Sequence, residues 1–272
     1  AYASNVFGDT TVDPAPAVVV PNNSVDACYS NVRTITTGTI ISPNAGTGQH
    51  AAGDFDGDGL QELAVDFGAN GVWLYDNAAF AQISTFNPEV LTSGDLNGDG
   101  QDEVIADFGA TGLWSRDGTT WTQISSFNVD GLAVGNVDVD PNDELVGDFG
   151  AVGLWLRDGA TWTMISGVNP ETVVIGDLTG TSAGEIVVDF GAVGVWYQSA
   201  GAWTQLSGVN VDGLAAGDID ADGAEEIAGD FGAAGLWLLN GGSWSQLSGV
   251  NVEQVIAANV NGAGGAEIMG DF

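Results

Sequence analysis

The residues best suited to chemistry lie in a short acidic loop that recurs along the chain. Residues 95–103 place side-chain oxygens at alternate positions, Asp95, Asn97 and Asp99, and end with Glu103. A calcium ion takes about six to eight oxygen ligands, and the glycines of the loop permit the tight turn that points such oxygens inward. The pattern therefore predicts a calcium site in this loop.

Three copies of the loop match Asp-x-Asp/Asn-x-Asp-Gly-x-x-Glu in full, and a fourth has Pro141 in place of the glycine. The predicted ligands are Asp54, Asp56, Asp58 and Glu62; Asp95, Asn97, Asp99 and Glu103; Asn136, Asp138, Asp140 and Glu144; and Asp218, Asp220, Asp222 and Glu226. Two other copies, around Asp177 and Asn259, carry too little charge for a metal. We therefore expect three to four calcium sites, and the alternative is a set of acidic β-turns without metal.

The glutamate that closes the loop does not follow the metal pattern. It is present even in the two poor copies, as Glu185 and Glu267, and so is the aspartate of the Asp-Phe pair that follows. We therefore expect these two acids to make structural hydrogen bonds to turn amides as well, so the loop aspartates are the better indicators of metal.

The loops belong to a repeat of 41 residues, with five complete copies and a sixth that stops at Phe272. Short β-branched or aromatic runs bounded by Gly, Asn and Asp predict strands, which in the second copy cover about residues 103–108, 112–116, 120–125 and 131–137. Four antiparallel strands in 41 residues match one blade of a β-propeller. Residues 27–52 equal in length the part that the sixth copy lacks, so we predict six blades, the last closed by N- and C-terminal strands.

Two series of aromatic residues keep the same register in the repeats, and we expect them to fill the space between blades. The first is Trp73, Trp114, Trp155, Trp196 and Trp237, and the second is Phe80, Trp121, Trp162, Trp203 and Trp244. The alternative role is that of stacking platforms for sugar rings, which requires exposure.

The composition limits the class of partner. Lys+Arg total 3 against 37 Asp+Glu, for a formal net charge of -34, so the surface repels nucleic acid and anionic lipid and attracts cations. No apolar run reaches membrane-spanning length, and we expect no membrane insertion. The single Cys28 excludes an internal disulfide, and the start at Ala1 is compatible with a secreted, mature chain.

Residues 1–26 remain outside the predicted propeller of residues 27–272. They contain an apolar run between prolines, residues 15–21, that has no core of its own. Such a segment suits docking on a neighbouring copy by strand addition, and the alternative is folding back on its own propeller.

The repeats resemble the FG-GAP/VCBS family, through the acidic loop and the Phe-Gly pairs Phe67-Gly68, Phe108-Gly109, Phe149-Gly150, Phe190-Gly191 and Phe231-Gly232. The resemblance covers about residues 53–272 and implies an extracellular propeller with calcium in the four better loops. It leaves the biological role open, since the family includes adhesion proteins, lectins and scaffolds.

Among the function classes, an enzyme is the least expected. The chain has one histidine, His50, one cysteine and no lysine, so no nucleophile-base pair or phosphate loop stands out. We expect a calcium-binding surface subunit with a structural or adhesive role that forms a filament through residues 1–26. The alternative is a multivalent lectin that binds glycans between its blades.

Overall fold

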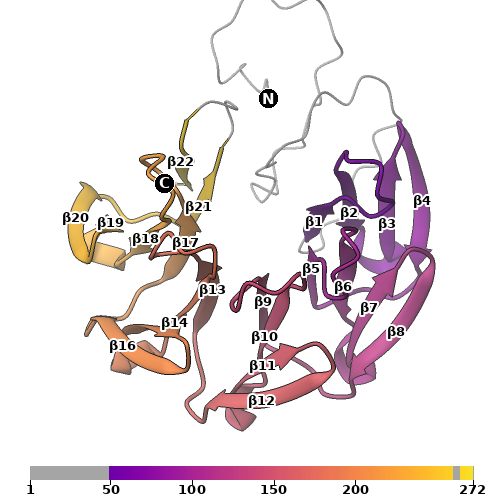
Figure 1. Cartoon of the computed structure of the whole chain (residues 1–272), viewed down its shortest axis with the longest axis horizontal. Helices are drawn as coiled ribbons and strands as arrows, with labels where there is room; N and C mark the ends of the chain where they lie inside the picture. The colour runs from indigo at the N-terminus through magenta and orange to yellow at the C-terminus, as the bar shows by residue number, and fades with distance from the viewer. Residues whose placement is uncertain (1–48, 260–263, 272) are drawn as a thin grey trace, which may run out of the picture.

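The computed structural model describes residues 49–259 and 264–271, and this part of the chain is all-β (Figure 1). Blade one contains β1 (His50–Gly53), β2 (Glu62–Asp66), β3 (Val72–Asp76) and β4 (Ala79–Ser84). Blade two contains β5 (Val90–Gly94), β6 (Glu103–Asp107), β7 (Leu113–Asp117) and β8 (Thr120–Ser125). Blade three contains β9 (Gly131–Gly135), β10 (Glu144–Asp148), β11 (Leu154–Asp158) and β12 (Thr161–Ser166).

The remaining described blades repeat this order. Blade four contains β13 (Thr172–Gly176), β14 (Glu185–Asp189), β15 (Val195–Ser199) and β16 (Ala202–Ser207). Blade five contains β17 (Gly213–Gly217), β18 (Glu226–Asp230), β19 (Leu236–Asn240) and β20 (Ser243–Ser248). Blade six contributes β21 (Gln254–Ala258) and β22 (Glu267–Asp271).

Each blade is an antiparallel sheet in which neighbours in sequence are neighbours in space. The innermost strands contact one another from blade to blade in the order β1, β5, β9, β13, β17 and β21, and the sheets fan outward from them (Figure 1). These features confirm the predicted six-bladed propeller. The strands expected from residues 27–48 to complete blade six lie outside the described residues.

The core lies between the blades because the sheets of blades two to five are covered on both faces. In blade two, Val104, Ile105 and Ala106 of β6 are 0% exposed, so residues that point to opposite faces of the strand are equally buried. Side chains of neighbouring blades join in single clusters, such as Leu96, Leu113 and Val129 of blade two and the following connection with Leu145 of blade three. This packing explains why the strand reads as a continuous apolar run rather than an alternating one.

The two aromatic series occupy different places. In the second series, Trp121 donates its indole N–H to the carbonyl of Ile83 in the preceding blade (2.9 Å), and Trp162, Trp203 and Trp244 repeat this inter-blade bond. The first series bonds within its own blade, as Trp114 does to the carbonyl of Thr111 (3.0 Å). Both series are half-buried. The second series lies on the outermost strands and shows the predicted inter-blade role through these bonds. The first series lies on the third strands, where Trp196 also packs against a cluster shared by blades three and four.

Candidate metal sites on the loop face

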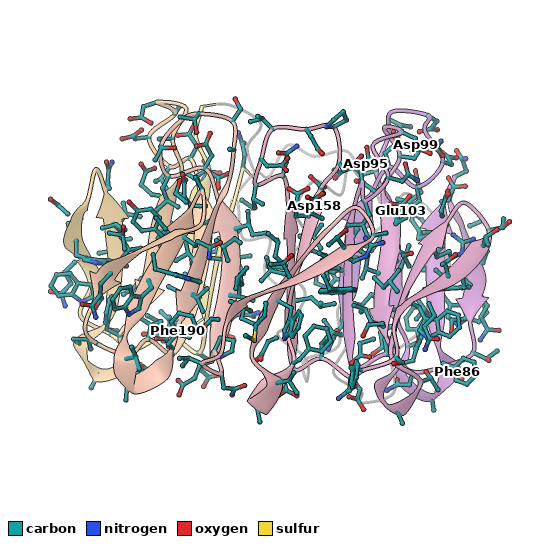
Figure 2. The ribbon with its side chains drawn as sticks, turned by 60° about the horizontal axis from the view of Figure 1, so that its bottom comes forward. Phe86, Asp95, Asp99, Glu103, Asp158 and Phe190 are labelled. Atoms are coloured by element: carbon teal, nitrogen blue, oxygen red, sulfur yellow. The ribbon has the colours of Figure 1, made fainter. Side chains whose placement is uncertain are left out.

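The acidic loops connect the innermost strand of a blade to its second strand, and they gather on one face of the propeller. Figure 2 places Asp95, Asp99 and Asp158 near one edge of the molecule, with Phe86 near the opposite edge. In the second loop, β5 ends at Gly94 and β6 begins at Glu103, so the eight intervening residues form the acidic turn. The fold thus collects the repeated carboxylates on a single surface, which we call the loop face.

The first residue of each loop, which is an aspartate in blades one, two, four and five and Asn136 in blade three, shapes the turn. The Asp95 carboxylate accepts hydrogen bonds from the backbone N–H groups of Gly98 (2.7 Å) and Gly100 (2.9 Å), and Asp54 makes the same pair of bonds to Gly57 and Gly59. Asp177, in a copy without a full ligand set, also accepts two such bonds, from Thr181 and Ser182. These side-chain-to-backbone bonds hold the turn in the loops with a full ligand set and in the loop without one.

The third loop residue after that aspartate adopts a left-handed conformation in every described copy. Gly57 has φ 77°, and the non-glycine residues Val139 (φ 65°) and Ala221 (φ 62°) occupy the equivalent position. A β-branched residue is strained in this region. The loop of blade three keeps its shape despite Val139 and Pro141, which explains how it can still gather its acids.

The closing glutamates are buried structural acceptors. Each accepts at its Oε2 a hydrogen bond of 2.7–2.9 Å from the backbone N–H seven residues earlier: Glu62 from Phe55, Glu103 from Leu96, Glu144 from Val137, Glu185 from Leu178 and Glu226 from Ile219. All five are at most 5% exposed. The expected structural role of the glutamate therefore extends to the copy around Asp177, and only its Oε1 remains for another ligand.

Three loops bring carboxylates together. Ligand oxygens within 4.8 Å of one another come from Asp54, Asp56 and Asp58 in blade one, from Asp218, Asp220 and Asp222 in blade five, and from Asp138, Asp140, Glu144 and Asp158 in blade three. The predicted ligands Glu62 and Glu226 are not members of these clusters of acids. Asn136 lies in the blade-three loop, where its side-chain amide donates to the carbonyl of Asp140 and its Oδ1 accepts from the Val139 N–H.

The blade-three cluster has the largest set of acids and an unsatisfied oxygen. Glu144 is 0% exposed, and its Oε1 has no hydrogen-bond partner. Burial raises the pKa of Glu144 to about 7, with smaller contributions from the charges of Asp138, Asp140 and Asp158. A bound divalent cation would be the missing partner of Glu144 Oε1 and would offset the repulsion among the four acids.

In two blades, other side chains of the same blade already donate hydrogen bonds to Oε1 of the closing glutamate. In blade two, Asn97 Nδ2 donates to Glu103 Oε1 (2.8 Å), so the predicted ligand Asn97 presents a donor rather than its oxygen to that carboxylate. In blade four, the hydroxyls of Thr179 and Ser199 donate to Glu185 Oε1 (3.1 and 3.0 Å). The remaining predicted ligands, Asp95 and Asp99, lie on the same loop as Asn97 and shape its turn.

The sequence pattern missed one class of ligand. Asp158 ends β11, outside the loop motif, and reaches the cluster from the turn between the two outer strands of blade three. The equivalent residue in blade five, Asn240, donates to Asp220 (2.8 Å). A polar residue recurs there in all five complete copies, as Asp76, Asp117, Asp158, Ser199 and Asn240, and this periodicity is the signal that could have identified it.

Comparisons with known proteins support the fold only. The sequence matches no protein-family model and no curated protein. An Agrocybe aegerita lectin, solved to explain specific recognition of non-reducing terminal N-acetylglucosamine, superposes with a TM-score of 0.60 at 17% identity, over 82% of this chain and 75% of that one. BBS1N, solved in complex with ARL6DN, gives 0.61 at 12% identity, over 88% of this chain and 82% of that one. The FG-GAP/VCBS resemblance is thus supported at the level of propeller-like architecture.

In the described part of the chain, a short 3-10 turn follows the second strand of blades one to five: η1 (Gly68–Asn70), η2 (Gly109–Thr111), η3 (Gly150–Val152), η4 (Gly191–Val193) and η5 (Gly232–Ala234). None of these helical segments is long and apolar enough to span a membrane. His50, the single histidine, lies half-buried in β1 at the start of blade one.

Proposed function

We propose that this chain is a non-enzymatic, extracellular calcium-binding propeller that serves as a structural or adhesive surface subunit and polymerises through residues 1–26. The observation that carries the calcium assignment is the unpartnered, fully buried Oε1 of Glu144 within a cluster of four acids. Asp138, Asp140 and Asp158 would complete the site, and the clusters of blades one and five would form two more. Extracellular calcium modules typically bind with Kd values of about 10⁻⁴–10⁻³ M and mainly stabilise the fold.

The calcium assignment is tested by isothermal titration calorimetry and by thermal unfolding of the full chain. Calcium should bind at three to four sites and raise the Tm, because an ion that binds only the folded state stabilises it. Removal of calcium with EDTA should lower the Tm. An unchanged Tm on chelation, together with no heat of binding, would contradict the assignment and leave the loops as acidic turns.

The structural role has support from the architecture and the composition. The chain combines a propeller that calcium can stabilise with an N-terminal segment that contains an apolar run without a core. If this segment docks on the next copy, the contact is heterologous and gives a filament unless the ring closes. Electron microscopy should therefore show polymers of the full chain, and polymers that persist after deletion of residues 1–26 would refute this mode of assembly.

A second candidate function is glycan binding. The Agrocybe aegerita lectin has a similar fold, and the half-buried indole rings on the outer strands offer faces on which sugars could stack. A glycan array, with N-acetylglucosamine-terminated glycans among the probes, separates the two proposals. Selective retention that free sugar competes away would favour the lectin, whereas no retention would favour the structural subunit.

A further inference from the structure

An aromatic hollow of about 500 Å³ lies between blades one and two, away from the acidic loops. Phe86, from the segment after β4, lines one side, and Phe108, Trp114 and Trp121 of blade two line the other. Phe86 lies at the edge of the molecule opposite to Asp95 and Asp99 (Figure 2). The volume falls within the range of about 300–1,000 Å³ that binding pockets have.

The hollow presents apolar surface because its polar groups are engaged within the fold. Trp121 Nε1 donates to the carbonyl of Ile83 (2.9 Å), Trp114 Nε1 donates to the carbonyl of Thr111 (3.0 Å), and the Thr111 hydroxyl donates to the carbonyl of Phe108 (3.1 Å). A sugar requires free hydrogen-bonding groups as well as ring faces. The ring faces that remain suit an apolar peptide better.

Phe86 is 62% exposed, although its ring packs against Phe108 with centroids 5.9 Å apart. The equivalent residue after blade two, Phe127, is also aromatic and is 68% exposed. The later equivalent positions are exposed valines: Val168 47%, Val209 60% and Val250 58%. Phe86 thus adds an exposed aromatic ring to the hollow, whereas the equivalent Val209 does not. Val209 is therefore the matched control position.

The sequence contains one segment with the matching chemistry. Residues 14–21 hold three of the chain's 7 prolines and three consecutive valines, without a charge. Proline-rich segments favour the extended polyproline II conformation and dock in aromatic-lined grooves at a low cost in entropy. We propose that residues 14–21 of a second copy of this chain occupy the hollow between blades one and two.

This assignment rests on the proposed polymerisation and names its docking site. If residues 27–48 complete blade six, only residues 22–26 link that blade to the apolar segment. Five extended residues span at most about 18 Å. With that closure, all of blade one would lie between blade six and the hollow, and for this reason the proposal assigns the hollow to the segment of a neighbouring copy.

A crosslinking experiment with the full chain tests the occupant. Val19 is replaced by a photoreactive benzophenone amino acid, and ¹⁵N-labelled and unlabelled copies are mixed as monomers before assembly. We expect mixed-isotope crosslinks from residue 19 to residues 83–86 or 108–121. Crosslinks confined to one isotope would assign the hollow to the chain's own segment, and crosslinks elsewhere on polymers would refute the hollow but leave polymerisation intact.

Substitutions test the hollow itself. Phe86→Ser should raise the protein concentration needed for half-maximal polymerisation by at least tenfold, and Val209→Ser should change it less than twofold. Analytical ultracentrifugation measures both, and an unchanged Tm shows that the variants fold. Equal effects of the two substitutions would overturn the assignment, whereas a wild-type chain that remains monomeric would refute the polymerisation proposal as well.

Discussion

Asp102 of blade two holds the first loop residue of blade one, Asp54, by two hydrogen bonds. The Asp102 carboxylate accepts from the Asp54 backbone N–H (2.8 Å), and the Asp102 backbone N–H donates to the Asp54 carbonyl (2.8 Å). The backbone bond recurs at each described junction, for example from Asp143 to Asp95 and from Glu225 to Asp177. The acidic loops therefore join neighbouring blades, and a cation held in a loop acts close to this junction.

Replacement of Asp102 by alanine should weaken the junction of blades one and two. The substitution leaves the Asp54 N–H without its side-chain acceptor, which typically costs about 1–3 kcal/mol when the group is buried. For a chain of this size we expect the Tm to fall by roughly 2–8 °C. Thermal unfolding by circular dichroism measures the change, with Thr122→Ala on the exposed face of β8 as the control; equal Tm values for the two variants would contradict the role of Asp102.

Replacement of Glu144 by glutamine should remove the blade-three metal site and retain the fold. Glutamine keeps one side-chain oxygen, which can still accept from the Val137 N–H, whereas its amide nitrogen takes the place of the oxygen that faces Asp138, Asp140 and Asp158. We expect one calcium ion fewer by calorimetry, or an affinity at least tenfold weaker at one site. Glu185→Gln is the matched control because hydroxyls already satisfy Glu185, and it should leave the calcium stoichiometry unchanged.

Replacement of Asn97 by aspartate should strengthen calcium binding in blade two. Asn97 now donates to Glu103 Oε1, whereas an aspartate makes all four predicted ligands of the loop acidic and repels that glutamate. Without calcium the Tm should fall by a few degrees, since a like charge replaces a hydrogen bond, and with calcium the loss should be reversed.

The Asn97 prediction is checked by the Tm difference between calcium and EDTA, which should increase relative to the wild type. Thr122→Asp adds the same charge on the exposed side of β8 and serves as the control. A calcium-dependent shift that is equal in the two variants would show that net charge, rather than the loop, determines the response.

Much of this arrangement follows from the sequence because the repeat constrains it. The 41-residue period predicted the number of blades. The strands predicted for residues 120–125 and 131–137 appear as β8 (Thr120–Ser125) and β9 (Gly131–Gly135). The presence of Glu185 in a metal-poor loop correctly indicated a structural acid. The loop motif does not predict the directions of the side chains. It does not show that the Asn97 amide points toward Glu103, or that the Asp158 carboxylate, at the end of another strand, lies close to the loop acids.

The buried aspartates of the Asp-Phe pairs predict a dependence of stability on pH. Asp107 and Asp189 are 0% exposed, and each has one carboxylate oxygen without a partner. Burial is the main cause that raises the pKa of each to about 6, and backbone hydrogen bonds, from Val129 to Asp107 and from Val211 to Asp189, act in the opposite direction. Nearby acids raise the pKa further: Glu89 and Asp130 for Asp107, and Glu171 and Asp212 for Asp189. These groups lie on the side of the blades away from the loops.

The sign of the effect follows from the direction of the shift. The unfolded state has an aspartate pKa of about 3.9, so between pH 4 and 6 the folded state binds more protons, and stability falls as pH rises through this window. Above about pH 7 the loss is complete, at up to about 3 kcal/mol for each group. Asp107→Asn removes one titration, and the decrease in Tm from pH 5 to pH 7.5 in EDTA should shrink by about 5 °C. Asp13→Asn removes the same charge from the N-terminal segment, and an equal reduction in that variant would attribute the effect to net charge instead of the buried carboxyl.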